Sequence, residues 1–203
     1  MADDIPSLEQ AERLLAESAS LNPGPWSAHS GFVAKGAQLI AAECPGLDPK
    51  RAYILGLLHD IGRRFGIKGM RHALDGYHFL AELGYPGSAR ICLTHSYPIR
   101  EDPHGATSWD GSDEEWRFVV EYLSSIEYDD YDRLIQLCDC LALPAGFCLM
   151  EKRLMDVALR YGSDEWTDVR WKAFIEIKEN FERRINGSIY RLLPGVVENT
   201  FNW

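Results

Sequence analysis

The stretch "YILGLLHDIGRRFG", residues 53–66, joins an apolar run to a histidine, an aspartate and two arginines. His59 lies four residues after Leu55, so in a helix the two side chains point to the same packed side. A histidine in such a place is more often a satisfied core residue than a ligand. The carboxylate of Asp60 changes this expectation, because a buried carboxylate needs a partner or a cation. The stretch therefore indicates a site that holds an ion at the end of a buried helix.

The surrounding sequence is typical of helices, because start and stop signals bracket apolar residues at helical spacing. Ser7–Gln10 and Ser112–Glu115 have the form of capping boxes, and Asp48-Pro49 provides an N-cap followed by proline. We expect Ser27 to cap the second helix. No stretch gives a convincing strand signal, so the predicted fold class is all-α. The expected helices are 8–20, 27–44, 49–59, 70–83, 87–96, 113–125, 130–143, 148–161 and 165–186.

The composition narrows the functional classes. A chain of 203 residues with a net charge of -10 fits one domain and argues against binding of nucleic-acid polymers, because no broad positive surface is available. A few local cations still suffice for a small phosphorylated ligand. The acidic start, Met1–Asp4, does not resemble a secretory signal, and no apolar stretch approaches the ~20 residues that span a bilayer. We therefore expect a cytoplasmic protein without membrane contact.

The five cysteines fit this compartment. Most of them lie in apolar runs, which favours buried free thiols in a reducing environment. A metal site at Cys138 and Cys140 is the weaker alternative, because no second cysteine pair accompanies them.

Asp139 is the most unusual polar residue of the later part of the chain. Apolar residues surround it on nearly every face of its expected helix. An ionised carboxylate in that environment requires a partner or a bound cation. The alternatives are an exposed side chain or a hydrogen bond to a neighbouring helix.

Five further histidines are spread along the chain. His29 is expected in the first turn of its helix, and His72 and His95 share helix faces with apolar residues. His78 follows His72 by six residues and so projects from a different face. His104 lies in the polar segment 98–111, a loop long enough to cover a site, which we call the covering loop. We expect surface or packing roles for His78 and His104.

In this order the residues resemble the HD-domain superfamily of metal-dependent phosphohydrolases. The resemblance covers about residues 27–144 and rests on "WSAHS", "GLLHDIGRR", "MRHALDGYHFLAELGY", "RICLTHS" and "LIQLCDCLA". A single His-Asp doublet is weak evidence, whereas these elements in order on separate helices are a strong signal. The resemblance implies that residues 1–203 form one HD-type helical bundle. Its metal-site core would be 27–144 and its C-terminal helical extension about 148–203.

The resemblance also implies a first metal site and, as in some members, a second. The residues at the first-site positions are His29, His59, Asp60 and Asp139. His72 and His95 occupy the second-site positions, with Asp60 as the bridging carboxylate. Imidazole and carboxylate ligands without thiolates suit Fe, Mn, Zn or Ni. The implied cofactor is therefore one or two divalent metal ions.

Basic residues follow the His-Asp doublet. Small bacterial members that cleave dinucleoside polyphosphates often have lysine three residues after the doublet's aspartate, and Arg63 holds that place here. Arginine keeps the cation but binds phosphate as a planar fork. We expect Asp60 and Arg63 to act in catalysis and Arg63 and Arg64 to bind substrate. Lys68 and Arg71 are expected to be further cations of the site or exposed surface charge.

The implied activity is hydrolysis of a phosphate ester or anhydride by metal-bound hydroxide, because a bound metal lowers the pKa of its water. The expected substrate is a nucleotide or a similar small phosphorylated metabolite. The alternatives are an HD-type di-iron oxygenase and a non-catalytic module that binds metal or nucleotide. The C-terminal helices are expected to pack on the bundle, with a homodimer contact as their alternative use.

Overall fold

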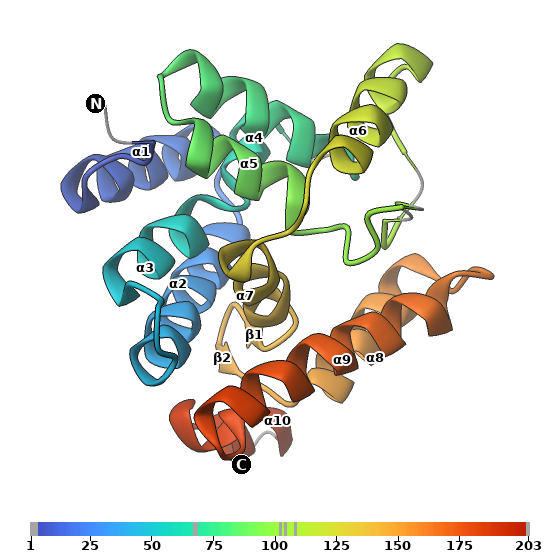
Figure 1. Ribbon diagram of the computed structural model, residues 1–203. Helices are drawn as coiled ribbons and strands as arrows, with labels where there is room; N and C mark the ends of the chain where they lie inside the picture. Colours follow the sequence, from blue (N-terminus) through green and yellow to red (C-terminus); the bar gives the residue numbers. More distant parts are fainter. Residues whose placement is uncertain (1–3, 67–68, 102, 104, 108, 202–203) are drawn as a thin grey trace.

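The computed structural model describes residues 4–66, 69–101, 103, 105–107 and 109–201, which form a bundle of helices (Figure 1). The all-α fold class predicted from the sequence is confirmed. The elements are α1 (Leu8–Leu21), α2 (Trp26–Glu43), α3 (Pro49–Leu58), the 3₁₀ turn η1 (Ile61–Phe65), α4 (Arg71–Glu82), α5 (Pro86–Thr94), α6 (Asp113–Ser125), α7 (Asp130–Asp139), β1 (Ala142–Leu143), β2 (Gly146–Phe147), α8 (Met150–Tyr161), α9 (Thr167–Ile185), the 3₁₀ turn η2 (Ile189–Leu192) and α10 (Val196–Phe201).

Capping side chains set several helix starts. Ser7 and Ser112 each form the expected capping box at the start of α1 and α6. Asp48 accepts a hydrogen bond from the backbone N–H of Lys50 at 2.8 Å at the start of α3. These contacts satisfy backbone donors that have no partner within the helix. The three starts agree with the expectation from the sequence.

The start of α2 differs from the expectation. The helix begins at Trp26, after Pro25, and has no side-chain cap, so the expected cap by Ser27 is wrong. Ser27 lies inside the first turn, and its hydroxyl donates to the carbonyl of Gly24 at 3.4 Å. With this start, His29 is the fourth residue of the helix and lies at the end of its first turn.

Helix α7 is shorter than expected and leads into strands that the sequence did not indicate. It ends at Asp139, and residues 142–147 form a small antiparallel hairpin in which Ala142 pairs with Phe147. Gly146 in this hairpin has φ +155, a backbone conformation that residues other than glycine rarely adopt. Because α7 ends at Asp139, this carboxylate lies at the negative end of the helix dipole, where it needs a nearby cation or donor.

Helices α2, α3 and α7 form the centre of the bundle, and the C-terminal segment packs on it (Figure 1). Ile177 and Phe181 of α9 and Ile189 of η2 are buried in the same apolar cluster as residues of α2 and α7. The expected packing of the C-terminal extension on the bundle is thus observed.

A backbone contact joins η1 to α4. A Cβ atom on Gly62 would lie 2.0 Å from the carbonyl oxygen of His72 and 2.4 Å from the backbone nitrogen of Gly76. Only glycine permits this approach, because any side chain would collide with backbone atoms. The contact holds the segment that carries Asp60 against the helix that carries His72.

All five cysteines are buried free thiols, as expected. Within the described ranges, no helix has the length and apolar character needed to cross a bilayer.

Substitution of Gly56 tests the contact between α3 and α2. A Cβ atom on Gly56 would lie 2.8 Å from the Cα atom of Ala34 in α2, so Gly56→Ala should lower the free energy of unfolding by about 1–3 kcal/mol. Urea denaturation measures the change. Gly31→Ala in α2 is the control, because nothing lies within 4 Å of its Cβ position and alanine favours a helix. A Gly56→Ala variant as stable as the parent would contradict the close contact.

Candidate functional site

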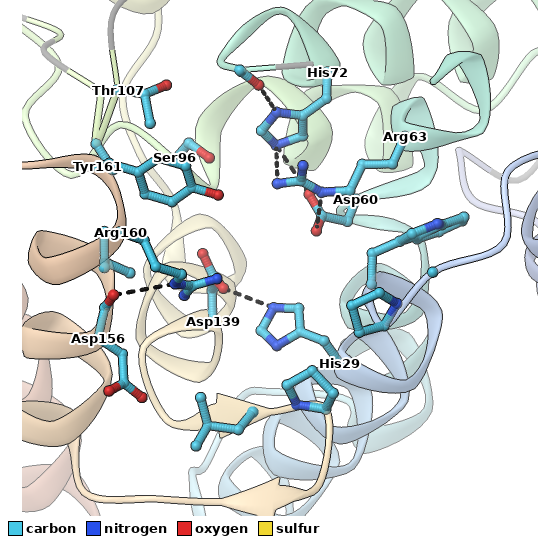
Figure 2. A pocket seen from close by; sticks show the side chains of 18 of the residues that line it. His29, Asp60, Arg63, His72, Ser96, Thr107, Asp139, Asp156, Arg160 and Tyr161 are labelled. Carbon is cyan, nitrogen blue, oxygen red and sulfur yellow. Dashed lines mark hydrogen bonds and ion pairs between the residues drawn. The ribbon is translucent and has the colours of Figure 1, made fainter. Parts of the chain in front are cut away.

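A cavity of about 680 Å³ opens between the start of α2, η1, the start of α4 and helix α8 (Figure 2). Residues from segments far apart in the sequence meet on its floor. The polar residues that meet there, and that belong to the cavity lining, include His29, Asp60, Arg63, His72 and Asp139. His59 and His95 are buried directly against them, with 1% and 2% of their surface exposed. The structure thus brings together all six residues at the expected metal-ligand positions.

Three of these histidines are oriented in the same way. Each Nδ1 atom lies against the backbone carbonyl three residues earlier. The distances are 2.7 Å from His59 to Gly56, 2.5 Å from His72 to Gly69 and 2.8 Å from His95 to Cys92. A carbonyl only accepts hydrogen bonds, so Nδ1 is the nitrogen that carries the proton. In its neutral form, each of these imidazoles therefore presents an unprotonated Nε2 lone pair.

The three Nε2 atoms gather around Asp60. The Nε2 atoms of His72 and His95 lie 3.0 Å and 3.6 Å from its Oδ1, and Nε2 of His59 lies 3.9 Å from its Oδ2. The Nε2 atoms of His72 and His95 are 3.4 Å apart. Lone pairs and carboxylate oxygens at these distances repel one another. A positively charged centre between them would remove the repulsion.

Two of these acceptors are orphans among the described residues. His59 Nε2 and Asp60 Oδ1 are buried without a geometrically acceptable hydrogen-bond partner. His72 lies within ion-pair distance of that oxygen, but the angle is unfavourable for a hydrogen bond. A buried acceptor left unpaired costs about 1–3 kcal/mol, more when it is charged. A divalent cation fits this donor set, because it would satisfy both atoms.

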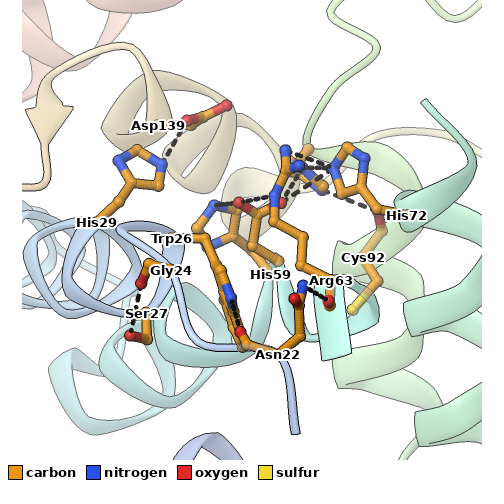
Figure 3. A network of polar contacts seen from close by, with 12 residues as sticks. Asn22, Gly24, Trp26, Ser27, His29, His59, Arg63, His72, Cys92 and Asp139 are labelled. Carbon is orange, nitrogen blue, oxygen red and sulfur yellow. Dashed lines mark hydrogen bonds and ion pairs between the residues drawn. The ribbon is translucent and has the colours of Figure 1, made fainter. Parts of the chain in front are cut away.

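A second group of ligand atoms adjoins the first. His29 Nε2 lies 2.9 Å from Asp139 Oδ1, and the rings of His29 and His59 are 5.4 Å apart (Figure 3). The ligand atoms of His29, His59 and Asp139 lie within 4.8 Å of one another, as do those of His59, Asp60 and His95. The two triads share His59. Imidazole and carboxylate ligands of this kind suit divalent transition metals.

Charge compensation keeps both carboxylates ionised. Burial alone would raise the pKa of Asp60, but Arg63 and the nearby histidines outweigh it and hold this pKa well below its usual range. For Asp139, burial is outweighed by the hydrogen bond from His29 and by the charge of Arg153. At neutral pH the site therefore contains two anionic ligands.

Burial favours the neutral form of two of the imidazoles, those of His59 and His95. Burial lowers the pKa of His59 below its ordinary value, and burial together with the neighbouring imidazoles lowers the pKa of His95 to about 3. Neutral imidazoles and ionised carboxylates are the protonation states that bind a metal.

Arg63 lies on the cavity floor beside these ligands. Its Nε donates to Asp60 Oδ2 at 2.7 Å, and its Nη2 lies 3.4 Å from His72 Nε2 (Figure 3). The side chain is 28% exposed and lines the cavity. A fixed guanidinium group is thus open to a ligand beside the candidate metal site.

Arg64 points elsewhere. Its guanidinium lies 3.9 Å from the ring centre of Phe79 and donates to the Ser18 hydroxyl at 3.2 Å. It does not belong to the described lining of the cavity. The substrate-binding role expected for Arg64 stays a prediction, and this position does not favour it.

Two other expected residues, His78 and Arg71, lie outside the described lining of the cavity. His78 is exposed and stacks on Phe118, in agreement with the surface role expected for it. Arg71 pairs with Glu115 at 2.8 Å. Lys68 and His104 lie outside the described residues.

Arg153 of α8 and Asp110 of the covering loop complete the site, and the sequence did not indicate these two residues. Arg153 Nη2 lies 3.4 Å from Asp139 Oδ1. The Asp110 carboxylate accepts hydrogen bonds from the backbone N–H groups of Gly69 and Arg71 at 2.7 Å and 2.8 Å. Because the Gly69 carbonyl also accepts from His72, Asp110 ties the covering loop to a candidate ligand. Such contacts between distant segments leave no local sequence signal.

The sequence profile of the HD domain matches residues 26–143, a stretch that contains the six candidate ligands. The chain belongs to the HD-domain family. The resemblance identified from the sequence motifs is thereby confirmed. HD domains bind divalent metals and form a superfamily of metal-dependent phosphohydrolases. No curated protein and no solved structure matches this chain.

Removal of one carboxylate tests metal binding by this HD domain. Asp139→Ala removes the only acid of the triad with His29 and His59, so the variant should lose metal and most activity. Metal content of the purified protein measures the effect. Asp130→Ala is the control, because it removes an exposed carboxylate at the other end of α7. Full metal content in Asp139→Ala would exclude this residue as a ligand.

The stability of the metal-free protein should depend on pH through His95. Its pKa falls from 6.5 to about 3 on folding, so the unfolded state binds more protons between these values. The free energy of unfolding therefore decreases as pH falls through this window, by up to about 1.4 kcal/mol per pH unit for one histidine. Urea denaturation with a chelator between pH 4 and 7 measures the slope. His95→Gln should flatten it, whereas His78→Gln should not; equal slopes would contradict the burial effect.

Proposed function

We propose that this HD-domain protein hydrolyses a phosphate ester or anhydride of a nucleotide or a similar small phosphorylated metabolite. One observation carries the proposal. The Arg63 guanidinium and the buried Nε2 and carboxylate atoms lie side by side on one cavity floor. A metal-ligand set alone would fit many chemistries. An arginine fixed beside it supplies the planar donor that a phosphoryl group requires.

The residues that would hold the metal are His29, His59, Asp60, His95 and Asp139, with His72 beside Asp60. A bound divalent ion supplies Lewis acidity and lowers the pKa of water. The protein supplies neutral imidazoles whose Nε2 atoms are aimed by backbone carbonyls. It also supplies two carboxylates that stay ionised at neutral pH.

Arg63 has two roles in this proposal. Its bond to Asp60 fixes the guanidinium, so little side-chain freedom is lost when a ligand binds. Its positive charge neutralises negative charge that grows on the phosphoryl oxygens. Burial would lower the pKa of Arg63, but Asp60 more than offsets this, so the group remains a cation.

The cavity suits a small organic phosphate. Its volume of about 680 Å³ lies within the range of sites for small ligands. Apolar side chains also line the cavity. They include Pro23, Trp26, Val157, Leu159 and Tyr161. Such a wall can bury the organic part of a nucleotide while the phosphate faces the floor.

A di-iron oxygenase is the second candidate function, and one observation favours it. His72 and His95 both lie within 3.6 Å of Asp60 Oδ1, so a second ion could be bound there. Oxygen consumption by the iron-loaded protein would support this function. Release of phosphate without oxygen consumption would exclude it. A metal-binding module without turnover would show neither.

Arg63 variants test phosphate chemistry separately from metal binding. Arg63→Ala should keep its metal but lower the turnover of phosphate esters on the order of 10²–10³-fold, because a charged contact to the transferred group is lost. Arg63→Lys should recover part of the loss, since it restores the charge but not the fork. Phosphate release from a panel of nucleotides, together with metal content, measures both effects.

The matched control is Arg64→Ala, which removes the neighbouring guanidinium from a position outside the cavity lining. It should retain the parental rate if Arg63 alone serves the phosphate. An Arg63→Ala variant that hydrolyses the best substrate at the parental rate would show that Arg63 has no part in the reaction.

A further inference from the structure

Helix α8 forms one wall of the cavity and lies outside the matched HD-domain segment. Its residues that line the cavity include Arg153, Asp156, Val157 and Arg160. Their spacing of three, four and seven residues places them on one face of the helix. This face, which we call the α8 cavity face, carries two of the three arginines in the described lining.

Arg153 forms the inner end of the α8 cavity face. Its Nη2 lies 3.4 Å from Asp139 Oδ1, and its side chain is 16% exposed. With Arg63 beside Asp60, each of the two carboxylates on the floor has one guanidinium neighbour. A single phosphoryl group bound at the carboxylates would face both of these cations.

Arg160 forms the outer end and has no acidic partner. Its Nε donates to the backbone carbonyl of Asp156 at 3.1 Å, and its guanidinium lies 5.5 Å from the ring centre of Tyr161. Within the described part of the chain, no carboxylate lies within ion-pair distance of it. Because of this hydrogen bond to the Asp156 carbonyl, the guanidinium lies about one helical turn, roughly 5 Å, back along α8 toward Arg153. Figure 2 shows this group on the cavity side of α8.

The one carboxylate on the α8 cavity face does not neutralise Arg160. Asp156 Oδ2 lies 3.6 Å from Lys152 Nζ. In Figure 2 the Asp156 carboxylate is directed away from the Arg160 guanidinium. Among the described residues Arg160 therefore has no acidic partner, and it lies about one turn beyond the position that a single phosphoryl group would occupy.

We propose that the α8 cavity face binds a second phosphoryl group, so that the substrate carries a chain of two or more phosphates on an organic group. The inference rests on the proposed function and deepens it. Arg63 and Arg153 face the phosphoryl group at the carboxylates, and Arg160 faces the next one along the chain. The exposed side chains of Leu159 and Tyr161, at the rim, lie where the organic group leaves the cavity.

Calorimetric titration of the metal-loaded protein tests this assignment without turnover. The probes are adenosine monophosphate and the α,β-methylene analogue of adenosine diphosphate, which differ by one phosphoryl group. The parent should bind the two-phosphate probe at least about tenfold more tightly, as a charged hydrogen bond contributes about 1.5–3 kcal/mol. Arg160→Ala should abolish this difference and leave the affinity for the monophosphate unchanged.

Lys172→Ala is the matched control, because it removes one exposed positive charge from α9, outside the cavity lining and away from Asp156. It should preserve the affinity difference, and Arg160→Lys should preserve part of it. A difference that persists in Arg160→Ala, or an equal loss for both probes, would overturn the assignment. Failure to release phosphate from any ester would instead contradict the proposed hydrolysis, whatever the titration shows.

Discussion

The structure depends on the placement of one buried and one partly buried carboxylate among imidazoles that cannot all be charged. Asp60 and Asp139 remain anionic because Arg63, Arg153 and the histidines compensate for the loss of water. Burial of such groups is unfavourable unless each one is paired. The helices that carry them must therefore end at the same place, and the bundle is arranged around that requirement.

The ends of α3 and α5 bring two imidazoles to this place and also orient them. His59 and His95 are the residues that follow α3 and α5, and their Nδ1 atoms meet carbonyls of the last helical turn. Those carbonyls lack a partner within the helix. One hydrogen bond thus completes the helix end, selects the tautomer of the imidazole and directs its lone pair toward Asp60. Backbone carbonyls alone thus orient these two imidazoles.

Much of this site could be predicted from the sequence, because the ligands are chemically unusual where they occur. Asp139 among apolar residues and the His-Asp doublet after an apolar run both indicated buried charge. The sequence favoured Arg63 for catalysis but predicted substrate binding for both Arg63 and Arg64, which follow the doublet within one helical turn. In the 3₁₀ turn that forms there, residues three apart are aligned, which directs Arg63 to Asp60 and Arg64 to the other side. Arg153 meets Asp139 only through tertiary packing, which no local pattern encodes.

Hydrogen bonds connect Asp110 of the covering loop to the candidate metal site. Asp110 accepts from the N–H of Gly69, and the carbonyl of Gly69 accepts from His72. A displacement of Asp110 would therefore act on the orientation of the His72 imidazole. By linkage, an ion held beside His72 would act on the position of Asp110 with the same coupling free energy.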